Sequence, residues 1–139
     1  MYFQNLPQQV WLAAMSLACG YAFWRGGRPE KLAALACVTA WAISPLVQDN
    51  HNWIDPQWGV GAVDLALLGV FVWLALTTDR VWLLYMSAFQ LLQVVIHVAI
   101  MVDKGVPAMP YRRGLVIWSY CTLVALAVGV WQVSRHPDP

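Results

Sequence analysis

The sequence predicts an all-α, polytopic membrane protein: a compact bundle of five transmembrane helices in a single domain that covers residues 1–139. Composition is the first observation behind this fold class. Of the 139 residues, 60% are hydrophobic and only 11% are charged, whereas a soluble domain carries about 25% charged residues. Patterning is the second, because nearly every charge stands between long apolar runs. A soluble core of this size cannot hide so much apolar surface, whereas lipid contacts it directly.

Five apolar runs reach or approach the length of about 20 residues that a helix needs to cross a bilayer. Each must be helical, because lipid offers no hydrogen-bond partners to an open backbone and no alternation typical of a membrane strand occurs. In chain order, the predicted spans are residues 6–24, 31–47, 58–78, 81–102 and 114–133.

The connections between the runs define the elements. A basic connector, residues 25–31, ends the first run, and Pro45 predicts a bend near the end of the short second run. Lys31 can extend that run by reaching toward the membrane surface. A turn at residues 77–80 joins the third and fourth spans as an antiparallel hairpin whose side chains face each other. The alternative for the first two runs is a re-entrant or interfacial hairpin, which their basic connector disfavours.

Small residues every four positions predict close helix packing inside lipid. Such ridges are Ala14, Ala18 and Ala22 on the first span; Ala36, Ala40 and Ser44 on the second; Ala62 and Ala66 on the third; and Ala125 and Gly129 on the fifth. Tryptophans at predicted span ends, among them Trp82, are expected at the headgroup level.

The basic residues predict an orientation. With five spans, Arg25, Arg28, Lys31, Arg80 and Arg135 share one side of the membrane, and Lys104, Arg112 and Arg113 share the other. The positive-inside rule then places the C-terminus in the cytoplasm and the N-terminus outside. The expected location is the bacterial cytoplasmic (inner) membrane.

Two ionisable residues lie inside the predicted spans, on opposite arms of the hairpin. Asp64 precedes the turn by 15 residues and His97 follows it by 17, so both lie roughly 22–26 Å from the turn at about 1.5 Å per residue. Gln90, Gln93 and His97 form one polar stripe on the fourth span. Asp64 is therefore expected to meet His97 or Gln93, and Tyr120 is expected to extend this polar cluster from the fifth span.

Four interpretations of the cluster stay open. The polar groups fix helix register by bonding to one another; or Asp64 and His97 form a proton or cation path; or the site holds a metal or haem; or Trp41, Trp118 and Tyr120 line a pocket for a lipid, quinone or other small ligand. A metal site would have to combine one of the outer loop residues Asp49, His51 or Asp55 with Asp64 and His97, at spacings that match no standard motif. We expect no metal and no cofactor.

Other function classes have little support in the chain. The sequence lacks nucleotide-binding and hydrolase motifs, and its loops are too short for a catalytic domain, so no enzyme is expected. A net charge of +1 without a large basic cluster gives no support to nucleic-acid binding. The three cysteines lie inside apolar runs, so we interpret them as small hydrophobic residues of the membrane interior.

The chain is therefore predicted to be an accessory, scaffold or oligomer-forming subunit of a membrane complex, in contact with lipids and with another membrane protein or a second copy. The alternative is a small proton or cation channel or transporter that uses Asp64 and His97. A weaker alternative is a ligand or redox sensor that acts through the outer loop.

Overall fold

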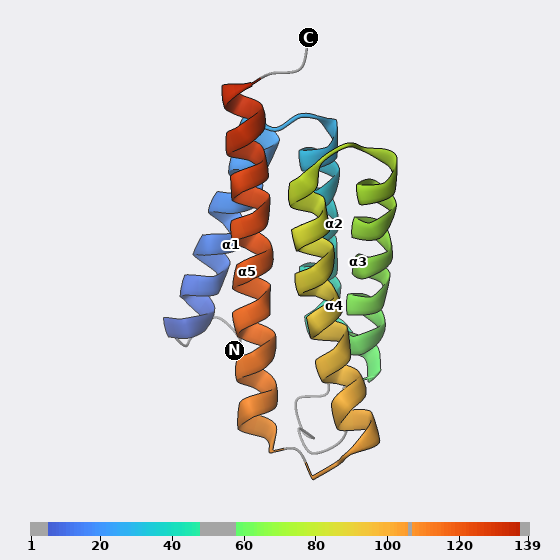
Figure 1. Cartoon of the computed structure of the whole chain (residues 1–139). Coiled ribbons are helices and arrows are strands. Elements are labelled where there is room, and N and C mark those ends of the chain that lie inside the picture. The colour runs from blue at the N-terminus through green and yellow to red at the C-terminus, as the bar shows by residue number, and fades with distance from the viewer. Residues whose placement is uncertain (1–5, 48–57, 106, 137–139) are drawn as a thin grey trace.

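The computed structural model describes residues 6–47, 58–105 and 107–136. These residues form five α-helices and no strand (Figure 1). The helices are α1 (Leu6–Arg25), α2 (Arg28–Val47), α3 (Trp58–Thr77), α4 (Val81–Val102) and α5 (Ala108–Arg135).

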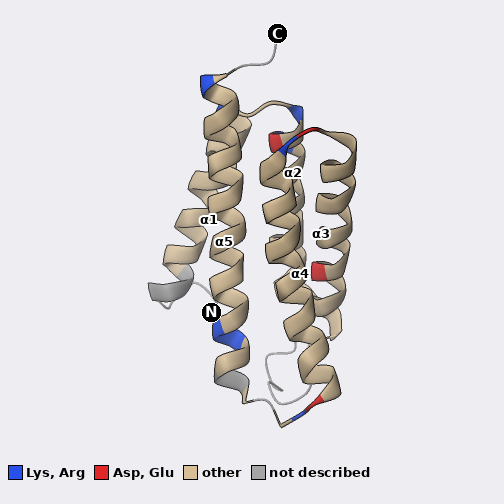
Figure 2. Ribbon diagram, in the orientation of Figure 1, with Lys and Arg blue, Asp and Glu red and all other residues tan. Residues whose placement is uncertain are grey.

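The helices run alternately up and down and close into a ring (Figure 1). Each helix packs against the next one in the chain, except that α5 returns to α1, and α2 also contacts α5 across the ring. Helices α3 and α4 form the antiparallel hairpin that the short turn predicts. Charged residues gather at the two ends of the bundle. The exception is an acidic residue within α3, which Figure 2 shows in red along the middle of the bundle.

Four helices, α2 to α5, are long and apolar enough to cross a membrane. The prediction of a helical bundle compatible with a multi-pass membrane protein is thereby confirmed. Helix α1 has 20 residues but is not among the four. It carries Gln8 and Gln9 near its start and Arg25 at its end, which lower its mean hydropathy.

Two helices extend beyond the predicted spans. Helix α5 begins at Ala108, six residues before the predicted start of 114, and continues to Arg135. Proline is tolerated in the first turn of a helix, because the backbone N–H groups there have no partner within the helix, so Pro110 does not delay the start. Helix α2 begins at Arg28, where Glu30 accepts a hydrogen bond from the Gly27 backbone N–H (2.9 Å).

Helix packing agrees with some of the small-residue ridges and not with others. Ala18 and Ala22 of α1 are buried, as is Ala125 of α5. A Cβ added to Gly129 would collide with the Trp82 indole, so glycine is required at this approach of α4 to α5. Trp82 is only 4% exposed, because its indole packs against Gly129 of α5. The predicted ridge on α3 is wrong, since Ala62 and Ala66 are exposed.

Candidate functional site

Asp64 and His97 meet between α3 and α4. The His97 Nε2 atom lies 2.8 Å from the Asp64 Oδ2 atom. His97 is 2% exposed and Asp64 15%. The two side chains lie at one depth because the connecting turn is tight, as the similar residue spacing on the two arms predicts. Lone ionised groups are costly in an apolar interior, and a direct pair lowers that cost.

The second nitrogen of the His97 ring also has a partner. The Tyr111 hydroxyl lies 2.8 Å from His97 Nδ1, and the two rings meet edge to face at 80°. Tyr111 is 3% exposed and comes from the first turns of α5. The imidazole is therefore held between a carboxylate and a phenol, supplied by two other helices.

A chain of amides reaches Asp64 from the opposite side. Gln90 Nε2 lies 3.1 Å from the Asp64 main-chain oxygen and 3.2 Å from Asp64 Oδ1. A main-chain carbonyl only accepts hydrogen bonds, so the Gln90 atom facing it must be the amide nitrogen. This contact fixes the orientation of the Gln90 amide and leaves its oxygen free to accept a hydrogen bond.

The remaining links follow from that orientation. Gln93 Nε2 donates to Gln90 Oε1 (3.1 Å), and the Ser119 hydroxyl donates to Gln93 Oε1 (2.9 Å). Ser119 Oγ also lies 2.7 Å from the Leu115 carbonyl oxygen, so its one hydrogen is shared between two acceptors. Every donor in this chain points toward Asp64. Gln90 and Gln93 are buried, and their polar groups are satisfied within the network, as buried groups require.

We call these six residues the polar network: Asp64, His97, Tyr111, Gln90, Gln93 and Ser119. When His97 donates from Nε2 to Asp64, the Tyr111 hydroxyl donates to Nδ1. Two series of donors then converge on one carboxylate, and both stabilise its negative charge.

The network borders a pocket at the centre of the ring. The pocket has a volume of about 110 Å³ and is lined by residues of all five helices. Its polar wall consists of Asp64, Gln90, Gln93, Ser119 and Thr122, and its apolar wall includes Trp11, Trp41 and Met15. A water molecule takes about 30 Å³ in the liquid, so a few waters fit beside the Asp64 carboxylate.

Three of the predicted site residues are not placed as expected. Tyr120 lies outside the polar network, because one residue after Ser119 the α-helix has turned by about 100°. Its ring instead meets Trp11 edge to face at 5.0 Å. The ligand pocket predicted from Trp41, Trp118 and Tyr120 is not formed by them together. Trp41 lines the central pocket, Trp118 stacks on Phe89, and Tyr120 borders a separate groove.

The outer loop residues Asp49, His51 and Asp55 lie outside the described residues, as does any site that they form. Among residues 6–47, 58–105 and 107–136, no three His, Cys, Asp or Glu side chains come together as a metal would require.

Sequence reasoning missed two buried residues, one in the candidate site and one outside it. One is Tyr111, which it assigned to a loop. Tyr111 and Ser119 are eight residues apart, so they share one face of a helix, and that spacing is the signal for Tyr111. The other is Glu30, whose side chain is fully buried at the far end of the bundle. Its signal is the position three residues after Gly27, where a glutamate reaches back to the N-cap backbone N–H.

Comparison of the chain with protein-family models, with curated proteins and with solved structures finds no match. Function must therefore be argued from the site itself.

Proposed function

We propose that this protein is a small multi-pass subunit of a bacterial inner-membrane complex and that its polar network binds a proton within the membrane. One observation carries the proposal: both ring nitrogens of a buried histidine are hydrogen-bonded, one to a carboxylate and the other to a phenol. Imidazole exchanges protons near neutral pH more readily than other side chains.

The network can gain a proton without losing a hydrogen bond. Without the extra proton, His97 donates from Nε2 to Asp64 and accepts at Nδ1 from Tyr111. With it, the imidazolium donates from both nitrogens and the Tyr111 oxygen becomes the acceptor. The Asp64 charge is then balanced by His97, so the protonated network is neutral overall. A neutral network is the less costly state in a membrane interior.

The rest of the bundle supports binding of a proton more than free conduction. Between the central pocket and the buried Glu30 lies a layer of fully buried apolar side chains: Phe71, Leu74, Leu83, Met86 and Leu126. Within the described residues, a single copy in this conformation offers no polar route through that layer. Passage across the membrane would require a conformational change or a partner, and for this reason we assign the chain the role of a subunit.

The infrared absorption of carboxyl groups tests proton binding directly. The purified protein in lipid nanodiscs is acidified stepwise, and the difference spectrum is recorded. We expect the antisymmetric carboxylate band of Asp64 to shift as the neighbouring His97 takes up a proton. The response must disappear in Asp64→Asn and change in His97→Gln.

Glu30→Gln is the matched control, since Glu30 is the fully buried carboxylate among the described residues of the bundle. It removes a buried acid and leaves the network intact. A wild-type response that survives in Asp64→Asn, or that disappears in Glu30→Gln, contradicts the proposal.

A transport activity of the isolated chain is the alternative, favoured by the central pocket beside Asp64. Proton and cation flux into proteoliposomes separates it from the subunit role. If wild type and Asp64→Asn are equally inactive, the chain alone is no transporter, and partners should be captured in mild detergent. A wild-type flux that Asp64→Asn abolishes favours transport by the chain itself.

The orientation belongs to the same proposal. Five crossings, α1 included, place Lys104 and Arg135 on opposite sides of the membrane. A cysteine at position 104 should then react with an impermeant reagent added outside cells, and one at position 135 only after the cells are opened. If both cysteines react from the same side, α5 does not cross the membrane between them, and this topology is wrong.

A further inference from the structure

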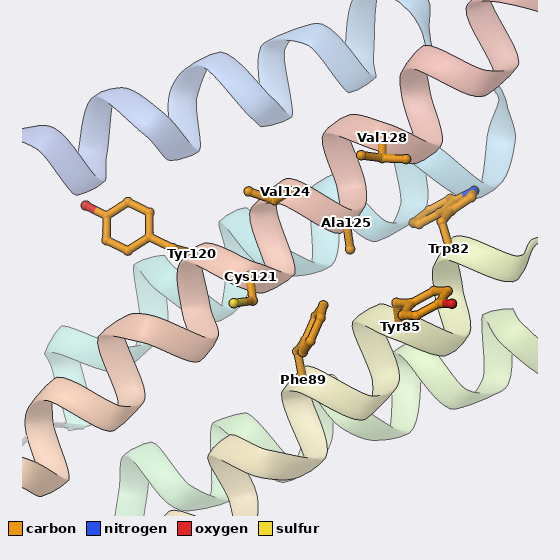
Figure 3. Close-up of a pocket in the computed structure, with 8 residues that line it drawn as sticks. All are labelled: Trp82, Tyr85, Phe89, Tyr120, Cys121, Val124, Ala125 and Val128. Atoms are coloured by element: carbon orange, nitrogen blue, oxygen red, sulfur yellow. The ribbon is translucent and has the colours of Figure 1, made fainter.

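A second, separate hollow lies on the outer surface of the bundle between α4 and α5. It has a volume of about 340 Å³, and its lining is almost wholly apolar. Phe89 and Tyr85 of α4 form one wall, Val124 and Val128 of α5 form the other, and the Tyr85 hydroxyl lies on the side nearer the start of α4 (Figure 3). We call this hollow the α4–α5 groove.

The floor of the groove is fixed by close helix packing. The Trp82 ring lies directly against Gly129, where no side chain fits. Ala125, 8% exposed, continues the floor along α5. A large indole on one helix and small residues on the other leave a channel along the surface that no described side chain fills.

The groove leads to a basic hollow at the end of the bundle. Val124, Val128, Trp131 and Arg135 are spaced i, i+4, i+7 and i+11, so they share one face of α5. A further hollow of about 500 Å³ is lined by Arg80, Trp131, Gln132, Arg135 and His136. The guanidinium of Arg135 lies over the Trp131 ring at 4.7 Å. The carboxylate of Glu30 lies 4.0 Å from Arg80, and Asp79 directly precedes Arg80 in the chain; neither acidic residue lines the hollow.

The distances match one leaflet of a bilayer. Along the α5 axis, Val128 lies about 10 Å from Arg135 and Cys121 about 21 Å. The acyl layer of one leaflet is about 15 Å thick. The groove therefore begins within the acyl layer and reaches the depth where lipid tails end, while the cations lie at the headgroup level.

We propose that the α4–α5 groove and the adjoining basic hollow form a binding site for an anionic phospholipid, with one acyl chain in the groove and the phosphate near Arg135. Charge complementarity decides the occupant. A helix of a second copy would bury the groove but gives no role to the cations at its end. A zwitterionic lipid would fill the groove but gain less from the basic hollow. This inference rests on the membrane placement proposed above and is independent of proton binding.

The test is native mass spectrometry of the full chain, with phosphatidylglycerol or phosphatidylcholine added to the detergent solution. We expect wild type to retain one phosphatidylglycerol in preference to phosphatidylcholine. Arg135→Gln should weaken phosphatidylglycerol binding about fivefold, the effect of one basic side chain at a membrane surface, and leave phosphatidylcholine binding unchanged.

Arg25→Gln is the matched charge control. Arg25 lies at the same end of the bundle and over a tryptophan, Trp24, at 4.6 Å, but it does not line the basic hollow. We expect no loss of lipid binding in this variant. If Arg25→Gln and Arg135→Gln weaken phosphatidylglycerol binding equally, the effect comes from general surface charge and the proposed site is wrong.

A groove-filling pair tests the acyl chain. Val128→Trp should weaken binding of both lipids, and Val116→Trp, at an exposed position of the same helix outside the groove, should not. Neither change touches the buried core, so folding is retained. If Val128→Trp changes the oligomeric state and leaves lipid binding intact, a second copy covers the groove and the proposal is wrong.

Discussion

Two carboxylates lie inside the described part of this bundle in different surroundings: Glu30 is fully buried near one end, and Asp64, 15% exposed, lies between α3 and α4. Asp64 takes part in a network that extends over three helices, beside a pocket with room for water. Glu30 is fully buried, accepts one hydrogen bond from the backbone of Gly27 and lies 4.0 Å from Arg80. Its second oxygen has no hydrogen bond within the described residues.

The difference indicates two uses of a buried acid. Glu30 is bonded within three residues of itself, as a helix cap that starts α2. Asp64 is bonded to residues 26 and 33 positions away, so its contacts join separate helices. Only Asp64 has an imidazole partner that can accept a proton. We therefore propose proton binding at the pair of His97 and Asp64 and a structural role for Glu30.

The largest expected effect comes from breaking the Asp64–His97 pair on one side. His97→Leu leaves a carboxylate buried with the amides alone and should destabilise the protein by about 3 kcal/mol. The double variant His97→Leu with Asp64→Leu should be less destabilised, because no charge is left unpaired. Unfolding in mixed micelles measures both. A double variant as unstable as the single one would contradict a mutual pair.

Glu30 should be less sensitive. Glu30→Leu removes the acceptor for the Gly27 N–H and should cost about 1–2 kcal/mol in the same unfolding measurement. Glu30→Gln keeps an acceptor oxygen at the cap and serves as its control, with a smaller expected loss. A cost for Glu30→Leu equal to that of His97→Leu would mean that the two carboxylates do not differ as described.

The two tyrosines of α5 provide a matched pair. Tyr111→Phe removes the hydrogen bond to His97 and should cost about 1 kcal/mol, since the ring itself remains. Tyr120→Phe lies outside the polar network and should change stability by less than about 0.5 kcal/mol. Thermal unfolding in detergent is sufficient to rank them. The reverse ranking would place Tyr120 in the network, as the sequence alone predicts.

The smallest effect is expected at the end of the amide chain. Ser119→Ala removes the donor to Gln93 and should cost about 0.5–1 kcal/mol. Thr122→Val is the control, because the Thr122 hydroxyl donates to the Trp118 carbonyl within its own helix. If both changes cost the same, the contact between Ser119 and Gln93 contributes nothing to stability.

The sequence predicted the helices well, because apolar runs ended by basic or turn residues leave few alternatives. It also predicted that Asp64 and the stripe on α4 would face each other, since a four-residue turn constrains two neighbouring helices. Tyr111 could not be placed in this way. The predicted span begins too late, at residue 114, because Pro110 and two arginines resemble a loop in isolation, whereas α5 begins at Ala108.

Contacts between helices distant in the chain were harder to predict. Tyr120 and Ser119 differ by one residue, and only the rotation of α5 in the ring decides which of them faces α4. The burial of Trp82 likewise depends on Gly129, 47 residues later, coming to lie against it. The spacing of residues along one helix predicts which side chains share a face. Which helix packs against that face depends on the tertiary structure.

The protonation of the His97 ring tests the central claim most directly. In a chain with His51→Gln and His136→Gln, ¹⁵N resonances of the remaining imidazole report each nitrogen separately. We predict that Nε2 carries the proton at alkaline pH and that Nδ1 gains a second one on acidification, and that Asp64→Asn alters this change. A ring protonated at Nδ1 alone, or one that never takes up a second proton, would contradict the account.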